Sequence, residues 1–159
     1  MLDDGAFDGR TAFRDLLQGA LAAAAQQNWR ELILSDATFA DWPLGERSSI
    51  EALQAWATSG RSLQLIAGDF GIFEREHPRF VQWRQRWDHI IVCSLCSGSG
   101  TPTVPSAIWT PGWFLHRIDP VRCRGVSGTA PERRVALRQL LDECLRHGRP
   151  GFAASTLGL

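Results

Sequence analysis

The sequence predicts an α/β protein with a mixed, mostly parallel sheet that is flanked by helices and ends in an antiparallel hairpin. Three observations predict this fold class. Amphipathic segments alternate with short apolar runs over the first seventy residues, strands that are joined through a helix are parallel, and a later segment has the pattern of two strands around a Pro-Gly pair. The 159 residues, 44% hydrophobic and 21% charged, are typical of one globular domain. We expect that domain over residues 1–148, followed by a C-terminal tail over 149–159.

The first half of the chain predicts helix, strand, helix and strand in that order. Apolar residues spaced three and four apart predict a helix over 11–27, and the run Leu-Ile-Leu at 32–34 is typical of a strand covered on both faces. The next helix is expected to begin at Ser48, which forms a capping box with Glu51. The segment SLQLIAGD (62–69) predicts a second strand, parallel to the first and next to it.

The second half predicts one more helical region, three or four strands and a final helix. The helical region is expected over 70–87 with a division at Pro78, the strands over 89–96, around the hairpin 106–118 and over 123–128, and the last helix from a capping box at Thr129 and Glu132 to about Arg146.

The loop after the first predicted strand is the clearest candidate for a ligand site. It is crowded with acidic and aromatic side chains, and ligands of open α/β sheets bind beyond the carboxyl ends of the parallel strands. The candidate ligand-binding residues at these strand ends and in the hairpin are Asp36, Phe39, Asp41, Trp42, Arg47, Asp69 and His116. The alternative is structural: the aspartates make turn hydrogen bonds, the aromatic rings pack between layers, and His116 is a core histidine.

Composition and spacing exclude several chemistries. All 17 basic residues are arginine, so lysine Schiff bases and phosphate-binding P-loops are excluded. Within a strand, Cys93 and Cys96 would point to opposite faces, so we interpret Cys93, Cys96, Cys123 and Cys144 as reduced thiols and expect no metal and no cofactor.

An arginine-rich and tryptophan-rich region at 75–87 raises the alternative of nucleic-acid binding. Arginine binds phosphate and aromatic rings stack on bases, but Phe80, Trp83 and Trp87 have the spacing of a core-facing helix. The formal net charge is zero, so nucleic acid is not the expected partner. No apolar block is long enough to span a membrane and no signal peptide is visible, so we expect a cytoplasmic protein.

The order of these elements resembles half of a phospholipase D-like domain. The residues that carry the resemblance are the loop Asp-x-x-Phe-x-x-Trp-Pro-Leu at 36–44, the strand SLQLIAGD, and the hairpin followed by RGVSGTAPERRVAL (124–137). It covers roughly residues 7–147 and is closest to a group of uncharacterised bacterial proteins, related stretches of which occur as extensions of acetyltransferase-like proteins. The resemblance implies a seven-stranded mixed sheet between helices and two halves paired face to face.

The catalytic signature of that family is missing. The family uses His-x-Lys, with an aspartate five residues after the lysine, and a chain without lysine cannot supply it after His77, His89, His116 or His147. The leading hypothesis is therefore a non-catalytic, phospholipase D-like binding or regulatory module. The alternative is an enzyme of unrecognised type, with a crevice formed by Asp36, Asp41, Asp69 and His116.

The sequence also predicts association into a homodimer. A lone half-domain leaves uncovered the surface that faces the second half, and Trp109 and Trp113 flank the hairpin turn, where burial within one subunit is difficult. We expect these two residues at the interface. The alternatives are a different protein partner, or coverage of both tryptophans by Phe152 and Leu157 of the tail.

Overall fold

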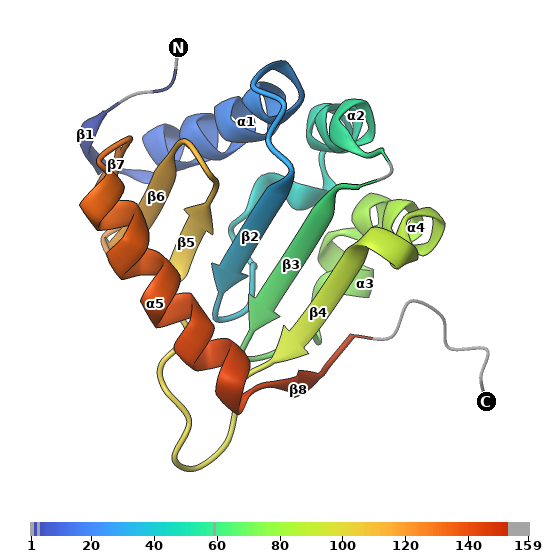
Figure 1. Cartoon of the computed structure of the whole chain (residues 1–159). Coiled ribbons are helices and arrows are strands. Elements are labelled where there is room, and N and C mark those ends of the chain that lie inside the picture. Colours follow the sequence, from blue (N-terminus) through green and yellow to red (C-terminus); the bar gives the residue numbers. More distant parts are fainter. Residues whose placement is uncertain (1, 3, 59, 153–159) are drawn as a thin grey trace.

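An eight-stranded sheet with helices on both faces forms the domain (Figure 1). The structure, a computed structural model, describes residues 2, 4–58 and 60–152. The strands are β1 (Gly5–Asp8), β2 (Glu31–Asp36), β3 (Ser62–Ala67), β4 (Ile91–Leu95), β5 (Ser106–Trp109), β6 (Phe114–Asp119), β7 (Arg124–Gly128) and β8 (Arg149–Pro150). The helices are α1 (Arg10–Gln26), α2 (Arg47–Trp56), α3 (Phe73–Glu76), α4 (Pro78–Arg86) and α5 (Pro131–His147), with 3-10 turns at Pro43–Gly45 and Asp88–Ile90.

The strand order is β1-β7-β6-β5-β2-β3-β4-β8. Strand β3 pairs in parallel with β2 and with β4, as expected for strands joined through helices. The prediction of a mostly parallel sheet is wrong, because the other pairings between described strands are antiparallel. Short connections make β5, β6 and β7 a meander, and the ends of the described chain add β1 and β8. These two strands are too short to reveal an alternating pattern in the sequence.

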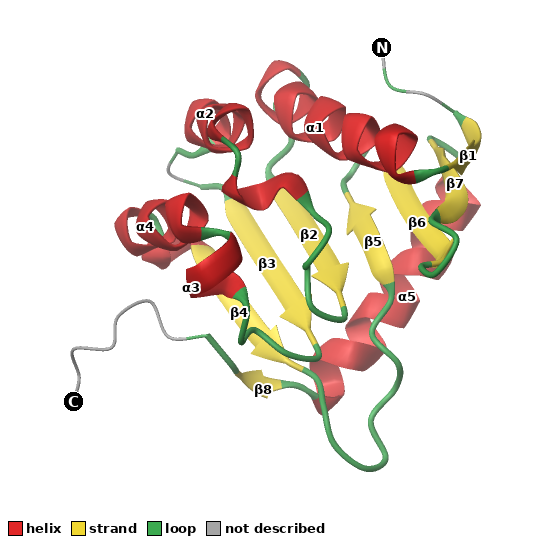
Figure 2. Ribbon diagram, turned by 180° about the vertical axis from the view of Figure 1, so that it is seen from behind, coloured by secondary structure: helices red, strands yellow, loops and turns green. Residues whose placement is uncertain are grey.

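The sheet separates two layers of helices (Figure 2), and an apolar cluster lies on each of its faces. Helices α1 to α4 cover one face, where Leu32 and Leu34 of β2 join the larger core cluster. Helix α5 crosses the other face, where Ile33 packs with Leu137 and Leu141. Successive strand residues point to opposite faces, so the continuous apolar run of β2 serves both layers. Among the described residues, no helix is both long enough and apolar enough to cross a membrane.

The helices lie where the sequence predicts them, but the first residues and caps of two of them differ from the prediction. The division of the third helical region falls at Pro78, as predicted. Helix α2 begins at Arg47 instead of after Ser48, and α5 begins at Pro131 after Ala130, and neither N-cap residue makes a side-chain hydrogen bond. The two predicted capping boxes are therefore not formed, because each helix starts at a different residue from the one that the capping box requires.

The sheet continues past the boundary expected at residue 148. Residues Arg149 and Pro150 pair with Leu95 and Ser94 of β4. Phe152 then packs on Phe70, with 5.5 Å between ring centroids, and does not reach the hairpin tryptophans. The rest of the predicted tail, including Leu157, lies outside the described residues.

Candidate functional site

Two of the predicted site residues, Asp36 and Asp41, meet at a buried arginine, Arg117. Arg117 lies on β6 and is 3% exposed. Its Nη1 donates to Asp41 at 2.5 Å, its Nη2 donates to Asp36 at 3.0 Å, and its Nε donates to Ser106 at 2.9 Å. The guanidinium also lies over the ring of Phe13, 4.1 Å from the centroid. We call Arg117, Asp36 and Asp41 the arginine cluster.

The arginine cluster is a structural anchor. Burial by itself would raise the pKa of Asp41 and lower that of Arg117, but the hydrogen bonds and opposite charges outweigh burial. The pKa of Asp41 is therefore lowered and that of Arg117 is raised. Asp36 also accepts hydrogen bonds from the backbone N–H groups of Thr38 and Phe39. The polar atoms of the cluster are thus hydrogen-bonded to other groups of the protein, and these bonds hold β6 against the loop after β2.

The aromatic residues of the same loop belong to the core. Phe39 is 0% exposed and Trp42 is 3% exposed, and their ring centroids lie 4.7 Å apart. Phe39 has a positive φ of 62°, an uncommon conformation for a non-glycine residue, and its carbonyl oxygen lies 2.8 Å from Nε2 of His77. These two residues therefore follow the structural alternative, in which the loop fastens the α1–α4 layer to the sheet.

Asp69 and His116 do not join the arginine cluster. The Oδ1 of Asp69 accepts a hydrogen bond of 2.7 Å from the backbone N–H of Gly71, a local turn contact. His116 alternates along β6 with Leu115 and Arg117 and so points to the α5 face of the sheet. Burial lowers its pKa. The structure therefore does not assemble the crevice proposed from the two aspartates, Asp69 and His116.

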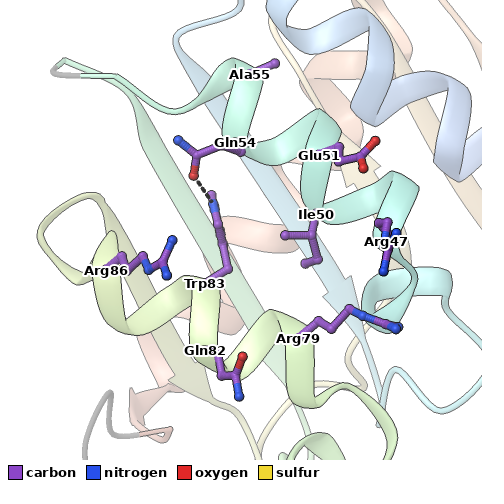
Figure 3. A pocket seen from close by; sticks show the side chains of 9 residues that line it. All are labelled: Arg47, Ile50, Glu51, Gln54, Ala55, Arg79, Gln82, Trp83 and Arg86. Carbon is purple, nitrogen blue, oxygen red and sulfur yellow. Dashed lines mark hydrogen bonds between the residues drawn. The ribbon is translucent and has the colours of Figure 1, made fainter.

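The last predicted candidate, Arg47, lines a surface groove between α2 and α4. The groove has a volume of about 620 Å³. Its lining residues are Arg47, Ile50, Glu51, Gln54, Ala55, Arg79, Gln82, Trp83 and Arg86 (Figure 3). Sequence reasoning selected one of these arginines as a ligand-binding residue and assigned the other two to a different region. The spacing of α2 and α4, which no local pattern reveals, brings the three together.

The groove has a positive lining over an apolar floor. Arg47 and Arg79 extend side by side at one end of the groove, and Arg86 lies at the other (Figure 3). All three are exposed, and Glu51 is the one acidic side chain of the lining. Arg79 donates through Nη1 to the carbonyl oxygen of Gly45 at 3.0 Å, which holds its guanidinium at the rim. Such spaced arginines can contact successive phosphates of an extended anion.

Two of the three aromatic residues singled out in the 75–87 region are buried and cannot stack on a ligand. Phe80 is 0% exposed and Trp83 is 4% exposed, as expected from their helical spacing. The indole N–H groups of Trp83 and Trp87 both donate to Oε1 of Gln54, at 3.1 and 3.0 Å. These contacts fix α4 against α2. The nucleic-acid alternative therefore keeps its arginines and loses Phe80 and Trp83 as stacking surfaces. Trp87 is partly exposed and stacks on His89, with 5.6 Å between ring centroids.

The hairpin tryptophans are covered within the subunit, so the premise of the interface prediction is wrong. Trp113 is 1% exposed and belongs to the core. Trp109 is half-buried, because its indole N–H donates to the carbonyl oxygen of Arg134 and the guanidinium of Arg138 lies 4.6 Å from its ring centroid. Helix α5 supplies both contacts. No local sequence pattern indicates that α5 crosses the hairpin.

The cysteines are buried, free thiols. Cys93 and Cys96 pack in clusters on opposite sides of the sheet, as their spacing in a strand predicted. Burial raises the pKa of Cys93 to about 11 and, together with nearby Cys96, that of Cys144 to about 12. Among the described residues, no three His, Cys, Asp or Glu side chains gather as ligands for a metal ion.

Comparison with known proteins finds similarity of structure and not of sequence. No family model matches the chain, and no curated protein matches it. TrmBL2, described as an archaeal chromatin protein with a novel mode of DNA binding, superposes with a TM-score of 0.66 at 9% identity over 93% of this chain, which spans about half (54%) of that chain. Nuc from Salmonella typhimurium, a phospholipase D family member, superposes with a TM-score of 0.61 at 11% identity, over 95% of this chain and 100% of Nuc. The protein therefore has a phospholipase D-like fold.

Proposed function

We propose that the protein is a non-catalytic module of phospholipase D-like fold that binds nucleic acid through the groove between α2 and α4. The observation that carries the proposal is the convergence of Arg47, Arg79 and Arg86 on one groove with a single carboxylate, Glu51. Arginine contacts to phosphate supply most of the affinity of sequence-independent nucleic-acid binding. The zero net charge of the whole chain does not oppose this, because the field at a groove depends on its local charges.

The absence of lysine supports a non-catalytic role. The family to which the fold is similar uses a His-x-Lys pair, and this chain has no lysine. The carboxylates of Asp36 and Asp41 are bound to Arg117, and Asp69 is bonded to its own turn, so none is positioned as a general base beside His116. The fold is retained without the groups that its hydrolytic members use.

The structural neighbour TrmBL2, which is described as binding DNA, favours nucleic acid over other polyanions as the ligand. The likeness extends over about half of that protein, so the proposal relies first on the groove and uses the neighbour to choose the ligand. Because Trp83 is buried under the groove, we expect contacts to the phosphate backbone and little preference for base sequence.

The test measures binding of fluorescent 20-nucleotide single-stranded and duplex DNA by anisotropy across a salt series. The variant R47Q/R79Q/R86Q should bind at least ten-fold more weakly than wild type. The matched control R122Q/R133Q/R146Q removes the same charge from exposed positions outside the groove and should bind normally. Three phosphate contacts predict a log–log salt slope of about −2 for single strands and about −3 for duplex. Equal loss in both triple variants, or no binding at low salt, would contradict the proposal.

We also propose that the protein forms a homodimer in the cytoplasm of a bacterial cell. Large exposed apolar side chains support a contact through the α5 side of the sheet: Ile118 is 63% exposed, Val135 57% and Leu140 50%. We therefore place the dimer interface on this surface and not at Trp109 and Trp113. The alternative is that a different protein binds the same surface. The free state of all four cysteines agrees with a reducing compartment.

A further inference from the structure

Arg84 of α4 is a buried charge whose ion pair is long and whose hydrogen bonds are incomplete. It is 5% exposed, and its Nε and Nη1 atoms have no hydrogen-bond partner among the described residues. The nearest carboxylate oxygen belongs to Asp88, 3.6 Å from Nη2, and that side chain is 54% exposed. A buried guanidinium with two unsatisfied nitrogens destabilises a fold, so packing alone does not account for an arginine here.

A short segment at the C-terminal end of the described chain covers Arg84. We call residues 149–152 the strap. The ring of Phe152 lies 4.7 Å from the guanidinium carbon, and it packs against Phe70 and Phe73 with centroid distances of 5.5 and 5.3 Å. The strap is held by the two-residue pairing of β8 with β4 and by one hydrogen bond of 3.2 Å from Gly151 to the carbonyl oxygen of Cys93. Phe152 itself remains partly exposed.

An open surface cavity of about 520 Å³ adjoins the strap. Phe70, Leu95, Gly151 and Phe152 line it together with residues of the loop after β3. It lies at the carboxyl ends of the parallel strands β3 and β4, where open α/β sheets bind ligands. Because Phe152 contacts both the cavity and the guanidinium, displacement of its ring would extend the cavity to Arg84.

We propose that the strap is a displaceable cover over a binding site for a small aromatic anion. The ring of the ligand takes the place of Phe152 against Phe70 and Phe73, and its carboxylate or phosphate accepts hydrogen bonds from the free N–H groups of Arg84. Asp69 and Glu74 also line the cavity and repel negative charge near them, so the charged group of the ligand lies at Arg84 and away from these two carboxylates. The site thus differs in ligand class from the α2–α4 groove and does not depend on it.

Binding of phenyl phosphate and phenylacetate, measured by isothermal titration calorimetry, tests the proposal. Inorganic phosphate, benzyl alcohol and benzylammonium are the comparison probes, which lack the ring, the charge and the correct sign respectively. Wild type should bind both aromatic anions, and F152A should bind them about ten-fold more tightly because the strap no longer competes. Binding by benzyl alcohol as strong as by phenyl phosphate would leave only an apolar cavity and overturn the proposal, as would equal affinities of F152A and wild type.

The variant R84M separates a binding role from a structural one. It keeps the length of the side chain and removes the charge, so it should abolish binding of phenyl phosphate while its melting temperature equals or exceeds that of wild type. The control R133M, which changes an exposed arginine of α5 outside both proposed sites, should keep full phenyl phosphate binding. A fold lost in R84M would identify Arg84 as structural and contradict the proposal, and the F152A measurement tests it independently.

Discussion

Removal of the Arg117 side chain tests the arginine cluster as the main polar anchor of the fold. In R117M, Asp36 keeps a charge at a position only 5% exposed and loses the guanidinium 3.0 Å away. Breaking a buried ion pair on one side costs about 3 to 5 kcal/mol. For a chain of 159 residues, each kcal/mol lowers the melting temperature by about 2 to 4 °C, so we expect a decrease of about 6 to 20 °C.

Thermal and urea unfolding followed by circular dichroism measure this loss. The double variant D36N/R117M removes the stranded charge and keeps an oxygen for the backbone N–H groups of Thr38 and Phe39, so it should be more stable than R117M by about 1 to 2 kcal/mol. The difference in unfolding free energy between wild type and R117M should also become smaller as the pH falls through the lowered pKa of Asp41, because protonation of Asp41 breaks its ion pair with Arg117 in wild type. An R117M protein within about 1 kcal/mol of wild type would refute the reasoning.

Two further predictions concern His116 and association. Because burial lowers the pKa of His116, the unfolded chain takes up its proton at higher pH than the folded chain. The contribution of His116 to the free energy of unfolding should therefore be complete above a pH of about 6.5 and decline below it, toward the pKa of the folded state. Urea titrations between pH 7 and 5 should show this decline for wild type and not for H116Q. The same decline in both proteins would contradict the prediction. Light scattering at micromolar concentration should give twice 17.7 kDa for wild type and the monomer mass for I118E/L140E, and a wild-type mass of 17.7 kDa would end the dimer proposal.

The sequence predicted the elements of the fold better than their arrangement. Helical periodicity located α1 and α4, and the continuous apolar run at 32–34 correctly indicated a strand covered on both faces. Local pattern cannot report which strand lies beside β2 on its other edge, because that pairing joins residues more than seventy positions apart. The antiparallel majority of the sheet followed from such distant pairings.

The candidate site was predictable only in part, for a related reason. The rule that polar residues gather after parallel strands brought Asp36 and Asp41 together correctly. The candidates chosen from the sequence include His116 and not its neighbour Arg117, the residue that joins the two aspartates. Arg117 occupies the same face of β6 as the core residue Leu115. An arginine in the inward register of a strand signals buried carboxylates, and that signal was available. The α2–α4 groove had no such signal, because it depends on the distance between two helices.

The outermost strands have a consequence for the state of the protein at high concentration. A sheet that ended at β7 and β4 would present two rows of unpaired backbone N–H and C=O groups, which are templates for edge-to-edge aggregation. Gly5–Asp8 pairs along most of β7 and Arg149–Pro150 pairs with the last two residues of β4, so the sheet ends in two very short edge strands. A fragment cut to residues 9–148 would retain helices α1 to α5 and most of both apolar layers, but it would expose longer unpaired rows along β7 and β4. Strands β1 and β8 thus shorten the exposed edges of the sheet, and their removal should lower the solubility of the protein at high concentration.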